Sequence, residues 1–458
     1  MKIFLTRLWV LLLLLGLFDS RAANTLNWQT GKDRVSADIQ SAELLRVLEG
    51  VAKLTGWQVF VESNCNSQVS VKFQDVPSGD ALRRLLGDLN YALVPATNSS
   101  SRLYVFRTTR ANATILVKPG DINPGSKLQA SKIPNELIVR VKPGVDIEEL
   151  AKKLGAKVLG KIESLNAYRL QFPDEAAANA ALAKLTGNPD VAGVENNYRM
   201  EQPPLVTRLD SGTGLPSPVQ LQLNPPGESG RVVVGLIDTA VQLQGSDLEK
   251  FLTKSISVAG EPATDSSGPS HGTSMFQDIL RGVSNTSGAS SSVQILSVDV
   301  YGADPLANSF NVATGIAAAI NNGANIINLS LGSENDSQVL RDIITQATQK
   351  GIPVFAAAGN NASAQPFYPA AYSSVISVTA GNNGQLAPYA NYADYIKLML
   401  PGSGVVYYNN QPYLVSGTST SSAFTSGLAA GFADSKRVNP PAAASALLNT
   451  TSIRFNPK

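Results

Sequence analysis

Five near-continuous apolar runs in the second half of the chain constrain its fold more than any other feature. The runs are VVVGLI (232–237), VQILSVDV (293–300), NIINLSL (325–331), IPVFAAA (352–358) and SVISVTA (374–380). Strands that are apolar on both faces are typical of parallel sheets covered by helices on both sides. Residues 310–323 and 336–351, which lie between these runs, have the length and the terminal glycine of helices. We therefore predict a doubly wound α/β domain with a parallel sheet over residues 230–458.

Two smaller units precede this domain. Residues 24–108 alternate strand-like and helix-like hydrophobic patterns, and residues 135–201 show the order strand, helix, strand, strand, helix, strand. We expect each unit to be a small α+β domain. Residues 109–134 and 202–229 are rich in Pro, Gly and Ser without periodicity, so we predict that they are linkers.

The first 22 residues have the layout of a secretory signal peptide. Lys2 and Arg7 precede the apolar run 8–18, and small residues follow, so cleavage is expected near Ala22 or Ala23. The alternative is an uncleaved membrane anchor, but the apolar run is short for a hydrocarbon core about 30 Å thick. We expect an exported protein, located in the periplasm or secreted.

Charge and residue counts exclude several classes of function. A formal net charge of +2 gives no electrostatic basis for binding nucleic acid. One cysteine, Cys65, and one histidine, His271, cannot form an internal disulfide or a zinc site of the Cys/His type. No loop has the regular Asp/Asn spacing of a calcium site. We therefore expect neither a metal nor another cofactor.

Three polar motifs lie where an α/β domain places its active site, outside the carboxyl ends of the strands. Asp238 follows the first apolar run, His271 precedes a helical segment, and Ser419 begins a helix of small residues. Taken singly, each is also common as a turn former or a helix cap. A hydroxyl needs a base to become a good nucleophile, and His271 is the only side chain here with an ordinary pKa near neutrality.

The motifs IDT, HGT and GTS, in the order Asp, His, Ser, resemble those of the subtilisin-like serine proteases (the subtilase, or peptidase S8, family). The motifs NLSLG and AAAGN lie between them in that family's order. The resemblance implies a serine endopeptidase that acts on a peptide or protein substrate. Ser419 would be the nucleophile, His271 the general base and acid, and Asp238 the group that orients the imidazole. Asn360 would stabilise the oxyanion together with the Ser419 amide.

The same resemblance assigns two walls of a substrate groove, which an extended peptide would enter as an added strand. The wall residues are Ser330, Leu331 and Gly332 on one side and Ala357, Ala358 and Gly359 on the other. The segment FYPAAY implies a cis peptide bond between Tyr368 and Pro369.

Residues 135–201 look like the propeptide domain of these proteases, on the pieces VKPG, LNAY and NPDV…VENNY. The resemblance implies a zymogen whose own propeptide-like domain is a partner of the protease domain. Its trailing strand, near Tyr198 to Pro203, would lie in the groove like a substrate, and Ser419 of the same molecule would cleave it there.

Residues 24–108 resemble the short N-terminal module that precedes outer-membrane secretins and TonB-dependent receptors. This resemblance implies a protein partner in the cell envelope, and a plain spacer domain is an equally open interpretation.

The chain also departs from the family pattern. Ala240 follows Asp-Thr where the family usually has glycine, HGTSMFQ lacks the family's second histidine, and Ala423 stands in place of a proline. The calcium site of many relatives is not evident. The three triad residue types are all present, so we favour a protease; the alternative is a catalytically inactive scaffold of the same fold that binds an envelope protein.

Overall fold

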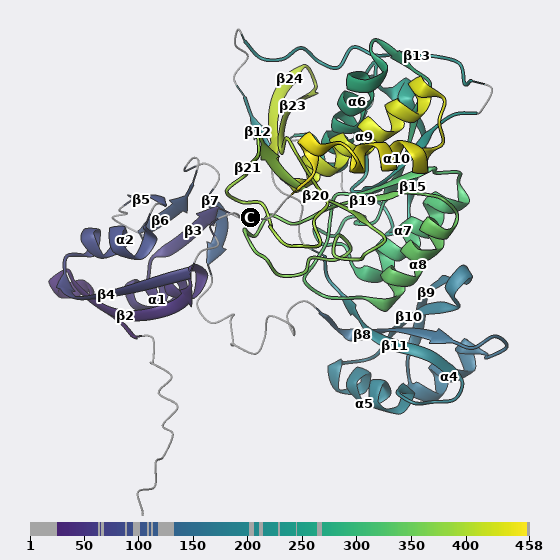
Figure 1. The fold of residues 1–458 in the computed structure, drawn as a ribbon. Coiled ribbons are helices and arrows are strands. Elements are labelled where there is room, and N and C mark those ends of the chain that lie inside the picture. The colour runs from purple at the N-terminus through teal and green to yellow at the C-terminus, as the bar shows by residue number, and fades with distance from the viewer. Residues whose placement is uncertain are drawn as a thin grey trace, which may run out of the picture. The chain divides into compact units, whose positions relative to one another are not determined.

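The computed structural model describes residues 25–455 with several gaps. The gaps are 63–64, 66–67, 88, 95–100, 108–109, 111–112, 118–131, 201–205, 210–213, 228–229, 244 and 263–267. The predicted signal peptide and most of the first predicted linker therefore lie outside the described residues. The chain divides into two compact units, Met1–Asp121 and Ile122–Lys458, and each is described by itself (Figure 1). Within the described ranges, no helix has the length and apolar character needed to span a membrane.

The described residues of the first unit form an α+β domain with two sheets and the helices α1 (Leu44–Thr55) and α2 (Ser78–Leu86). The antiparallel sheet contains β1 (Thr25–Gln29), β2 (Arg34–Glu43) and β4 (Gln68–Val76). The mixed sheet has the order β5 (Asn90–Val94), β6 (Arg102–Phe106), β3 (Gln58–Glu62), β7 (Ala113–Val117). Leucines from both helices share one core with valines of α1, which agrees with the helix-like hydrophobic patterns in this part of the sequence. Cys65 is buried in this core, and burial raises the pKa of its thiol to about 11.

The second unit begins with an α+β domain whose element order agrees with the prediction from sequence. The elements are β8 (Lys132–Val141), α4 (Ile147–Leu154), β9 (Lys157–Ile162), β10 (Ala167–Gln171), α5 (Glu175–Leu185) and β11 (Val191–Tyr198). The strands form an antiparallel sheet in the order β11-β8-β10-β9. Asp146 caps α4 by accepting from the amides of Glu148 and Glu149, and Gly155 ends it in the left-handed region with φ 70°.

The central sheet of the large domain is parallel and contains all five predicted apolar runs as neighbouring strands. Its order is β15 (Leu252–Ser257), β17 (Gln294–Asp299), β14 (Val233–Asp238), β18 (Ile326–Leu329), β19 (Val354–Ala357), β20 (Ile376–Asn382), with β22 (Leu398–Leu400) parallel to β20 and β21 (Gln385–Leu386) antiparallel to it. From β14 the chain forms β15 and then β17 on one side of β14, and it then crosses to β18 on the other side. The carboxyl end of β14 is therefore the switch point at which α/β sheets bind ligands.

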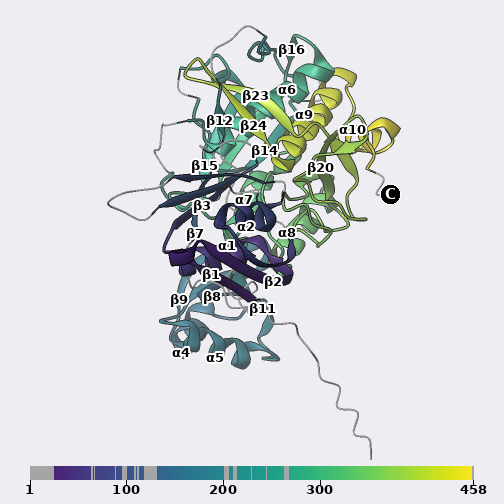
Figure 2. The ribbon, with the colours of Figure 1, turned by 90° about the vertical axis from the view of Figure 1, so that its left-hand side faces the viewer.

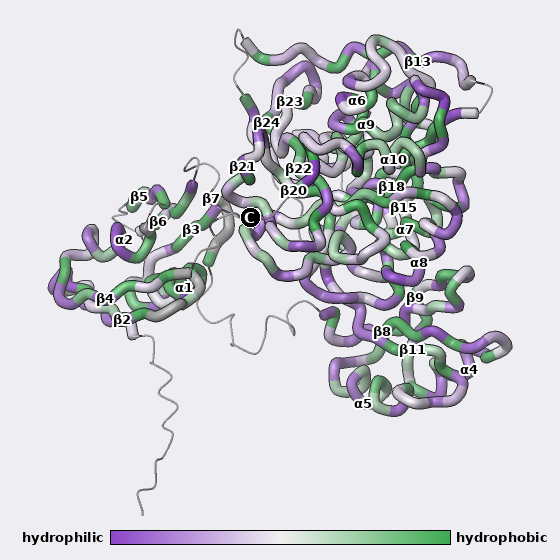
Figure 3. Tube along the Cα trace, viewed as in Figure 1, coloured by the Kyte–Doolittle hydropathy of each residue, from purple (hydrophilic) through white to green (hydrophobic). Residues whose placement is uncertain are grey.

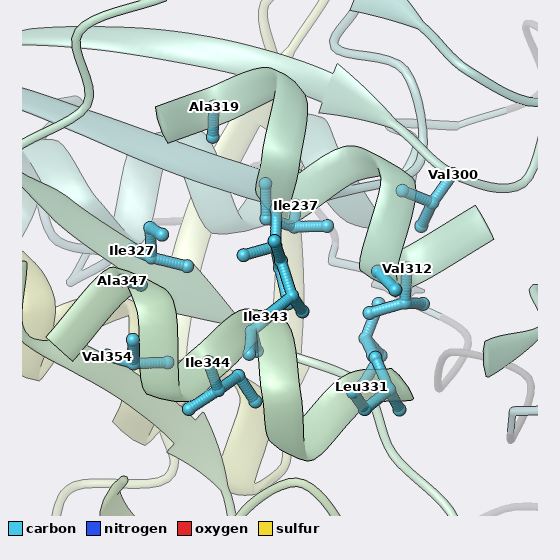
Figure 4. Close-up of a cluster of buried hydrophobic side chains, with 14 of the residues drawn as sticks. Ile237, Val300, Val312, Ala319, Ile327, Leu331, Ile343, Ile344, Ala347 and Val354 are labelled. Atoms are coloured by element: carbon cyan, nitrogen blue, oxygen red, sulfur yellow. The ribbon is translucent and has the colours of Figure 1, made fainter. Parts of the chain in front are cut away.

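Helices cover both faces of this sheet. α7 (Ser309–Asn321) and α8 (Gln338–Gln349) pack on one face, where Ile237, Ile327 and Val354 meet helix residues such as Ile343 (Figure 4). α6 (His271–Ser287), α9 (Thr418–Lys436) and α10 (Pro440–Leu448) cover the other face. Hydrophobic residues are concentrated in the central strands (Figure 3). The strands are thus buried on both faces, which explains why their sequences do not alternate.

The described part of residues 202–229 is more than a connection between domains. β12 (Thr207–Arg208) pairs with β24 (Gln411–Ser416), which in turn pairs with β23 (Ser403–Tyr408), and both views show β12 beside this hairpin (Figures 1 and 2). β13 (Gln222–Leu223) pairs with β16 (Ser290–Ser291). Strands of two residues leave no periodic pattern in a sequence, so the prediction of a plain linker missed them.

The small domain at the start of the second unit docks on α7 and α8 through polar groups that cap both helices. Glu195 accepts hydrogen bonds from the amides of Gln338 and Val339, both at 2.8 Å. Asn197 accepts from the Ser309 hydroxyl at 3.0 Å and the Phe310 amide at 3.2 Å. A carboxylate at a helix N-terminus satisfies amides that have no partner within the helix. Burial raises the pKa of Glu195 above its ordinary value.

Candidate active site

Asp238 and His271 meet at the carboxyl end of β14. The His271 Nδ1 atom lies 2.8 Å from Oδ1 and 2.9 Å from Oδ2 of Asp238. Ser270 caps α6 by accepting from the Thr273 amide, so His271 is held in the first turn of that helix. The Thr239 amide donates to Asp238 Oδ1 at 2.7 Å. A carboxylate beside Nδ1 keeps the proton on that nitrogen, which leaves Nε2 as the basic atom.

The Ser419 hydroxyl does not hydrogen-bond to His271 in this structure. Ser419 Oγ donates to the Ser330 carbonyl at 3.2 Å. His271 Nε2 is buried and has no hydrogen-bond partner among the described residues. Of the predicted triad, Asp238 and His271 are therefore in direct contact, while the Ser419 hydroxyl donates to a neighbouring carbonyl. A rotation about the Cα–Cβ bond of Ser419 would turn the hydroxyl away from that carbonyl.

Glycines pack α6 and α9 closely, and the packing brings their first turns to one place. A Cβ on Gly427 would lie 2.0 Å from the Ile279 carbonyl oxygen, and a Cβ on Gly431 would lie 2.7 Å from that of Val283. These contacts advance in the same direction along both helices, so the helices are parallel. Eight residues before Ile279 and Gly427 stand His271 and Ser419. The imidazole and the hydroxyl therefore lie at the same end of one tightly packed helix pair.

Asn360 lies against the start of α9, where the helix has free amides. Its Oδ1 atom accepts from the Thr418 amide at 2.8 Å and from the Thr418 hydroxyl at 3.1 Å. Because the oxygen is engaged by two donors, the hydrogen-bond pattern assigns Nδ2 as the atom that can donate elsewhere. The Ser419 amide is in the first helical turn, where no intrahelical acceptor exists. These two N–H groups suit a developing negative oxygen.

The two predicted walls follow the neighbouring strands β18 and β19, and both touch the first turn of α9. The Ser330 hydroxyl donates to the Ser419 carbonyl at 3.0 Å, and the Gly359 amide donates to the Thr418 hydroxyl at 3.1 Å. The Leu331 side chain is buried in the core beneath α7 and α8. Leu331 therefore offers only its backbone to a groove.

The other wall is supported from behind by a residue that the sequence did not single out. Ala357 is the last residue of β19, and the Ala358 amide bonds to Val378. The buried Asn391 donates to the Ala358 carbonyl at 2.9 Å and accepts from the Asn361 amide. An asparagine in a polar loop carries no pattern that would predict this contact.

A buried carboxyl group lies between α6 and α9 close to the site. Asp278 is seven residues after His271, on the same helix face, and its side chain is 1% exposed. Arg281 pairs with it at 2.9 Å and lies over the Phe424 ring, 4.9 Å from the centroid. Burial raises the pKa of Asp278 to about 6, although Arg281 and the neighbouring Thr420 and His271 oppose the shift. Sequence reasoning missed this group, whose only signal is an acidic residue in an apolar helix.

The departures from the family pattern fit the local packing. The Ala240 carbonyl accepts from the Ser270 hydroxyl at 2.6 Å and so helps to hold the start of α6. Ala423 is fully buried in α9. A Cβ on Gly272 would lie 2.1 Å from the Thr239 carbonyl oxygen, so only glycine fits after the histidine.

The Tyr368–Pro369 bond is cis, as the resemblance implied. No metal-binding cluster of His, Cys, Asp and Glu occurs in the described part of the chain.

A serine hydroxyl, an imidazole and a carboxylate near the switch point of a doubly wound sheet are the groups that a serine hydrolase requires. The subtilase family matches residues 229–456, and the fervidolysin N-terminal prodomain matches residues 125–197. The chain is 31% identical over 212 residues to subtilisin DY of Bacillus licheniformis, covering 44% of this chain and 77% of that protein. The chain belongs to the subtilase family, and it is a serine endopeptidase with a prodomain.

Other comparisons extend over more of the chain. A thermophilic serine proteinase of Bacillus sp. (strain AK1) is 29% identical over 320 residues, which cover 67% of this chain and 80% of that protein. Fervidolysin from Fervidobacterium pennivorans has a similar fold, with a TM-score of 0.52 at 20% identity over 70% of this chain and 57% of that one. The epidermin leader peptide processing protease of Staphylococcus aureus gives a TM-score of 0.51 at 18% identity, over 68% of this chain and 91% of that one.

Proposed function

We propose that Asp238, His271 and Ser419 are the catalytic triad of this endopeptidase, with Asn360 and the Ser419 amide as oxyanion donors. The observation that carries the proposal is the contact between His271 Nδ1 and the buried Asp238 carboxylate, at the start of the helix that packs in parallel against the Ser419 helix. The contact between Asp238 and His271 also disfavours the alternative of an inactive scaffold, because a protein that only binds a partner does not need this contact.

In the proposed mechanism, Ser419 Oγ attacks the peptide carbonyl while His271 Nε2 takes the hydroxyl proton. Asp238 stays ionised and stabilises the imidazolium. The carbonyl oxygen becomes an oxyanion between the Ser419 amide and Asn360 Nδ2. His271 then gives the proton to the leaving amine, and the peptide remains as an ester on Ser419. Water, deprotonated by His271, hydrolyses that ester and restores the serine.

The substrate, in this proposal, lies extended between residues 330–332 and 357–359. Its backbone adds to these segments as a strand, so that main-chain hydrogen bonds provide affinity and pockets provide preference. The two walls continue from β18 and β19, which are parallel neighbours in the sheet. Both walls contact the first turn of α9, which supports a groove that passes directly over Ser419.

We infer that the prodomain, residues 135–201, holds the zymogen inactive through its trailing strand. Arg199 forms a β-bridge with Asn308, and the Met200 amide donates to the Ala307 carbonyl at 2.9 Å. The Met200 side chain is buried against the large domain. These contacts support a tail that enters the groove as a strand. Cleavage is expected within residues 198–203, of which 201–203 lie outside the described residues.

Self-cleavage is tested by expressing the full chain beside Ser419→Ala and reading the new N-termini by mass spectrometry. We expect cleavage in the region of residues 198–203 in the wild-type chain and none in the variant. Ser421→Ala is the matched control, because Ser421 is a buried serine of the same helix whose hydroxyl bonds only to the Leu400 and Pro401 carbonyls. Equal trimming of wild type and Ser419→Ala would contradict self-cleavage.

We further propose that residues 1–22 export the chain to the periplasm or the medium, and that residues 24–108 contact an envelope protein. The exported location agrees with the family, whose curated relatives include a minor extracellular protease of Bacillus subtilis. Support for the partner is limited to the α+β fold of the module and its separation from the rest of the chain as a unit of its own. Cross-linking in the native envelope, with and without residues 24–108, tests the proposal.

A further inference from the structure

The ring of Phe367 lies between the glycines of the two proposed groove walls. A Cβ on Gly332 would lie 2.4 Å from Cε1 of Phe367, and a Cβ on Gly359 would lie 3.0 Å from its Cγ. The side chain is buried, with an exposed fraction of 3%. The ring therefore occupies the space that opens between the ends of the two neighbouring strands. It contributes to the need for glycine at both positions, together with the Tyr368 carbonyl oxygen at Gly332 and with Asn391 and a φ of 103° at Gly359.

The backbone around Phe367 fixes the ring in this place. Ser333 and Tyr368 exchange two hydrogen bonds, of 2.8 Å and 2.7 Å, which tie the residue after Phe367 to the end of the first wall. The Ala371 amide donates to the Phe367 carbonyl at 2.8 Å. A substrate side chain would have to displace a buried ring held on both sides, and overpacking of this kind is unfavourable.

The position of the ring relative to Ser419 determines which substrate residue it meets. The attacked carbonyl must lie at Ser419 Oγ, between the Ser419 amide and Asn360. One wall contacts Ser419 through Ser330, and the other contacts Thr418 through Gly359. The side chain of the residue that supplies the carbonyl therefore enters the gap between the walls, and the Phe367 ring closes this gap.

We propose that Phe367 fills the pocket for the residue on the acyl side of the cleaved bond, so that this endopeptidase cleaves after small residues such as alanine, glycine and serine. The inference rests on the proposed triad and groove walls. It makes Phe367 a specificity-determining residue, with no part in the chemistry. Aromatic and long aliphatic side chains are excluded by the ring.

The test uses two chromogenic peptides that differ only at this residue, succinyl-Ala-Ala-Pro-Ala and succinyl-Ala-Ala-Pro-Phe p-nitroanilide. For the processed wild-type enzyme we expect a higher kcat/KM with alanine. Phe367→Ala should raise the phenylalanine-to-alanine ratio of kcat/KM by at least about 10-fold, the scale of a change in pocket volume. Phe367→Leu keeps most of the apolar volume and is expected to shift the ratio in the same direction by less.

Phe251→Ala is the matched control, because Phe251 is also fully buried but lies in the core beneath α6 and α9. It should leave the ratio unchanged. A wild-type preference for phenylalanine, or an unchanged ratio in Phe367→Ala with activity retained, would overturn the inference. Absence of any cleavage together with absence of covalent labelling of Ser419 would refute the proposed triad, and the inference with it; that result is distinct from a wrong preference.

Discussion

The proposed chemistry of the site depends on how one carboxylate holds one imidazole in place. Asp238 is 1% exposed and touches His271 Nδ1 through both oxygens, so the ring can present only Nε2 to a substrate. The sequence predicts this pair because the chain has a single histidine and because Asp238 follows the first apolar run. Asp278 and Phe367 were not predictable in the same way. Their roles arise from contacts with segments distant in sequence, such as Gly332 for the Phe367 ring.

Asp238→Asn tests the proposed role of the carboxylate. The amide cannot hold the imidazole in the required tautomer or stabilise the imidazolium, so we expect kcat to fall by about 10⁴ with KM nearly unchanged, the size known for triad aspartates of serine proteases. Steady-state kinetics on a peptide anilide measure the effect. Near-wild-type kcat in a folded Asp238→Asn variant would remove this residue from the mechanism.

Asp278→Asn tests the buried carboxyl through the pH dependence of stability. Burial raises the pKa of Asp278 from its ordinary 3.8 to about 6, so between these pH values the folded chain holds a proton that the unfolded chain releases. The free energy of unfolding therefore falls as pH rises from about 4 to about 6, by up to about 3 kcal/mol. Arg281 and the imidazole of His271 are the ionisable groups that face Asp278.

Asparagine removes this titration, so the variant should lack that part of the pH dependence. Urea unfolding of both proteins in their uncleaved Ser419→Ala background, at several pH values from 4 to 7, measures the difference. Identical pH dependence in the two proteins would show that Asp278 does not titrate in this range.

At the scale of elements, the parallel packing of α6 and α9 sets the distance between the proposed base, His271, and the proposed nucleophile, Ser419. The role of the glycines in this packing cannot be predicted from the sequence, because it depends on which part of α6 each glycine contacts. Gly427, for example, lies against the Ile279 carbonyl. The near-continuous apolar runs predicted the central strands, and segment length with a terminal glycine predicted α7 and α8. The sequence did not predict β12 or β13, whose two-residue lengths depend on partners in the hairpin and in β16.

Gly427→Ala should separate the two helices. Its Cβ would lie 2.0 Å from the Ile279 carbonyl oxygen, so the backbone must shift. We expect a loss of about 1–3 kcal/mol in the free energy of unfolding and a larger loss of kcat than of affinity. Gly79→Ala in α2, where the structure offers open space, is the control and should change neither. Full activity in Gly427→Ala would contradict the role given to this contact.

Glu195→Ala should weaken the docking of the prodomain on α8. The carboxylate accepts from two helix amides, and loss of such a cap costs on the order of 1–2 kcal/mol. Thermal unfolding of the uncleaved Ser419→Ala chain should therefore show a lower Tm. Glu148→Ala is the control, because Glu148 is exposed on the far helix α4 and accepts no such bond. A Tm unaffected by Glu195→Ala would mean that the cap does not contribute to docking.

At the scale of the whole molecule, the chain combines a separate N-terminal unit with a prodomain and a subtilisin-like protease domain. The fold of the protease domain was predictable because parallel strands buried on both faces give long apolar runs. The strand-helix order of the prodomain was predictable from the strand-like and helix-like hydrophobic patterns of residues 135–201. The docking of the prodomain was not predictable, because Glu195 and Asn197 act through contacts with the ends of helices that lie far away in the sequence.

The account as a whole depends on Ser419 being an activated nucleophile. A fluorophosphonate reacts covalently with a serine whose hydroxyl proton is taken by a neighbouring base, and mass spectrometry of the digested protein locates the modified residue. The account predicts that the processed chain is labelled at Ser419 and that labelling is lost in His271→Ala. Absence of labelling at Ser419 after the prodomain is removed, or equal labelling in His271→Ala, would contradict it.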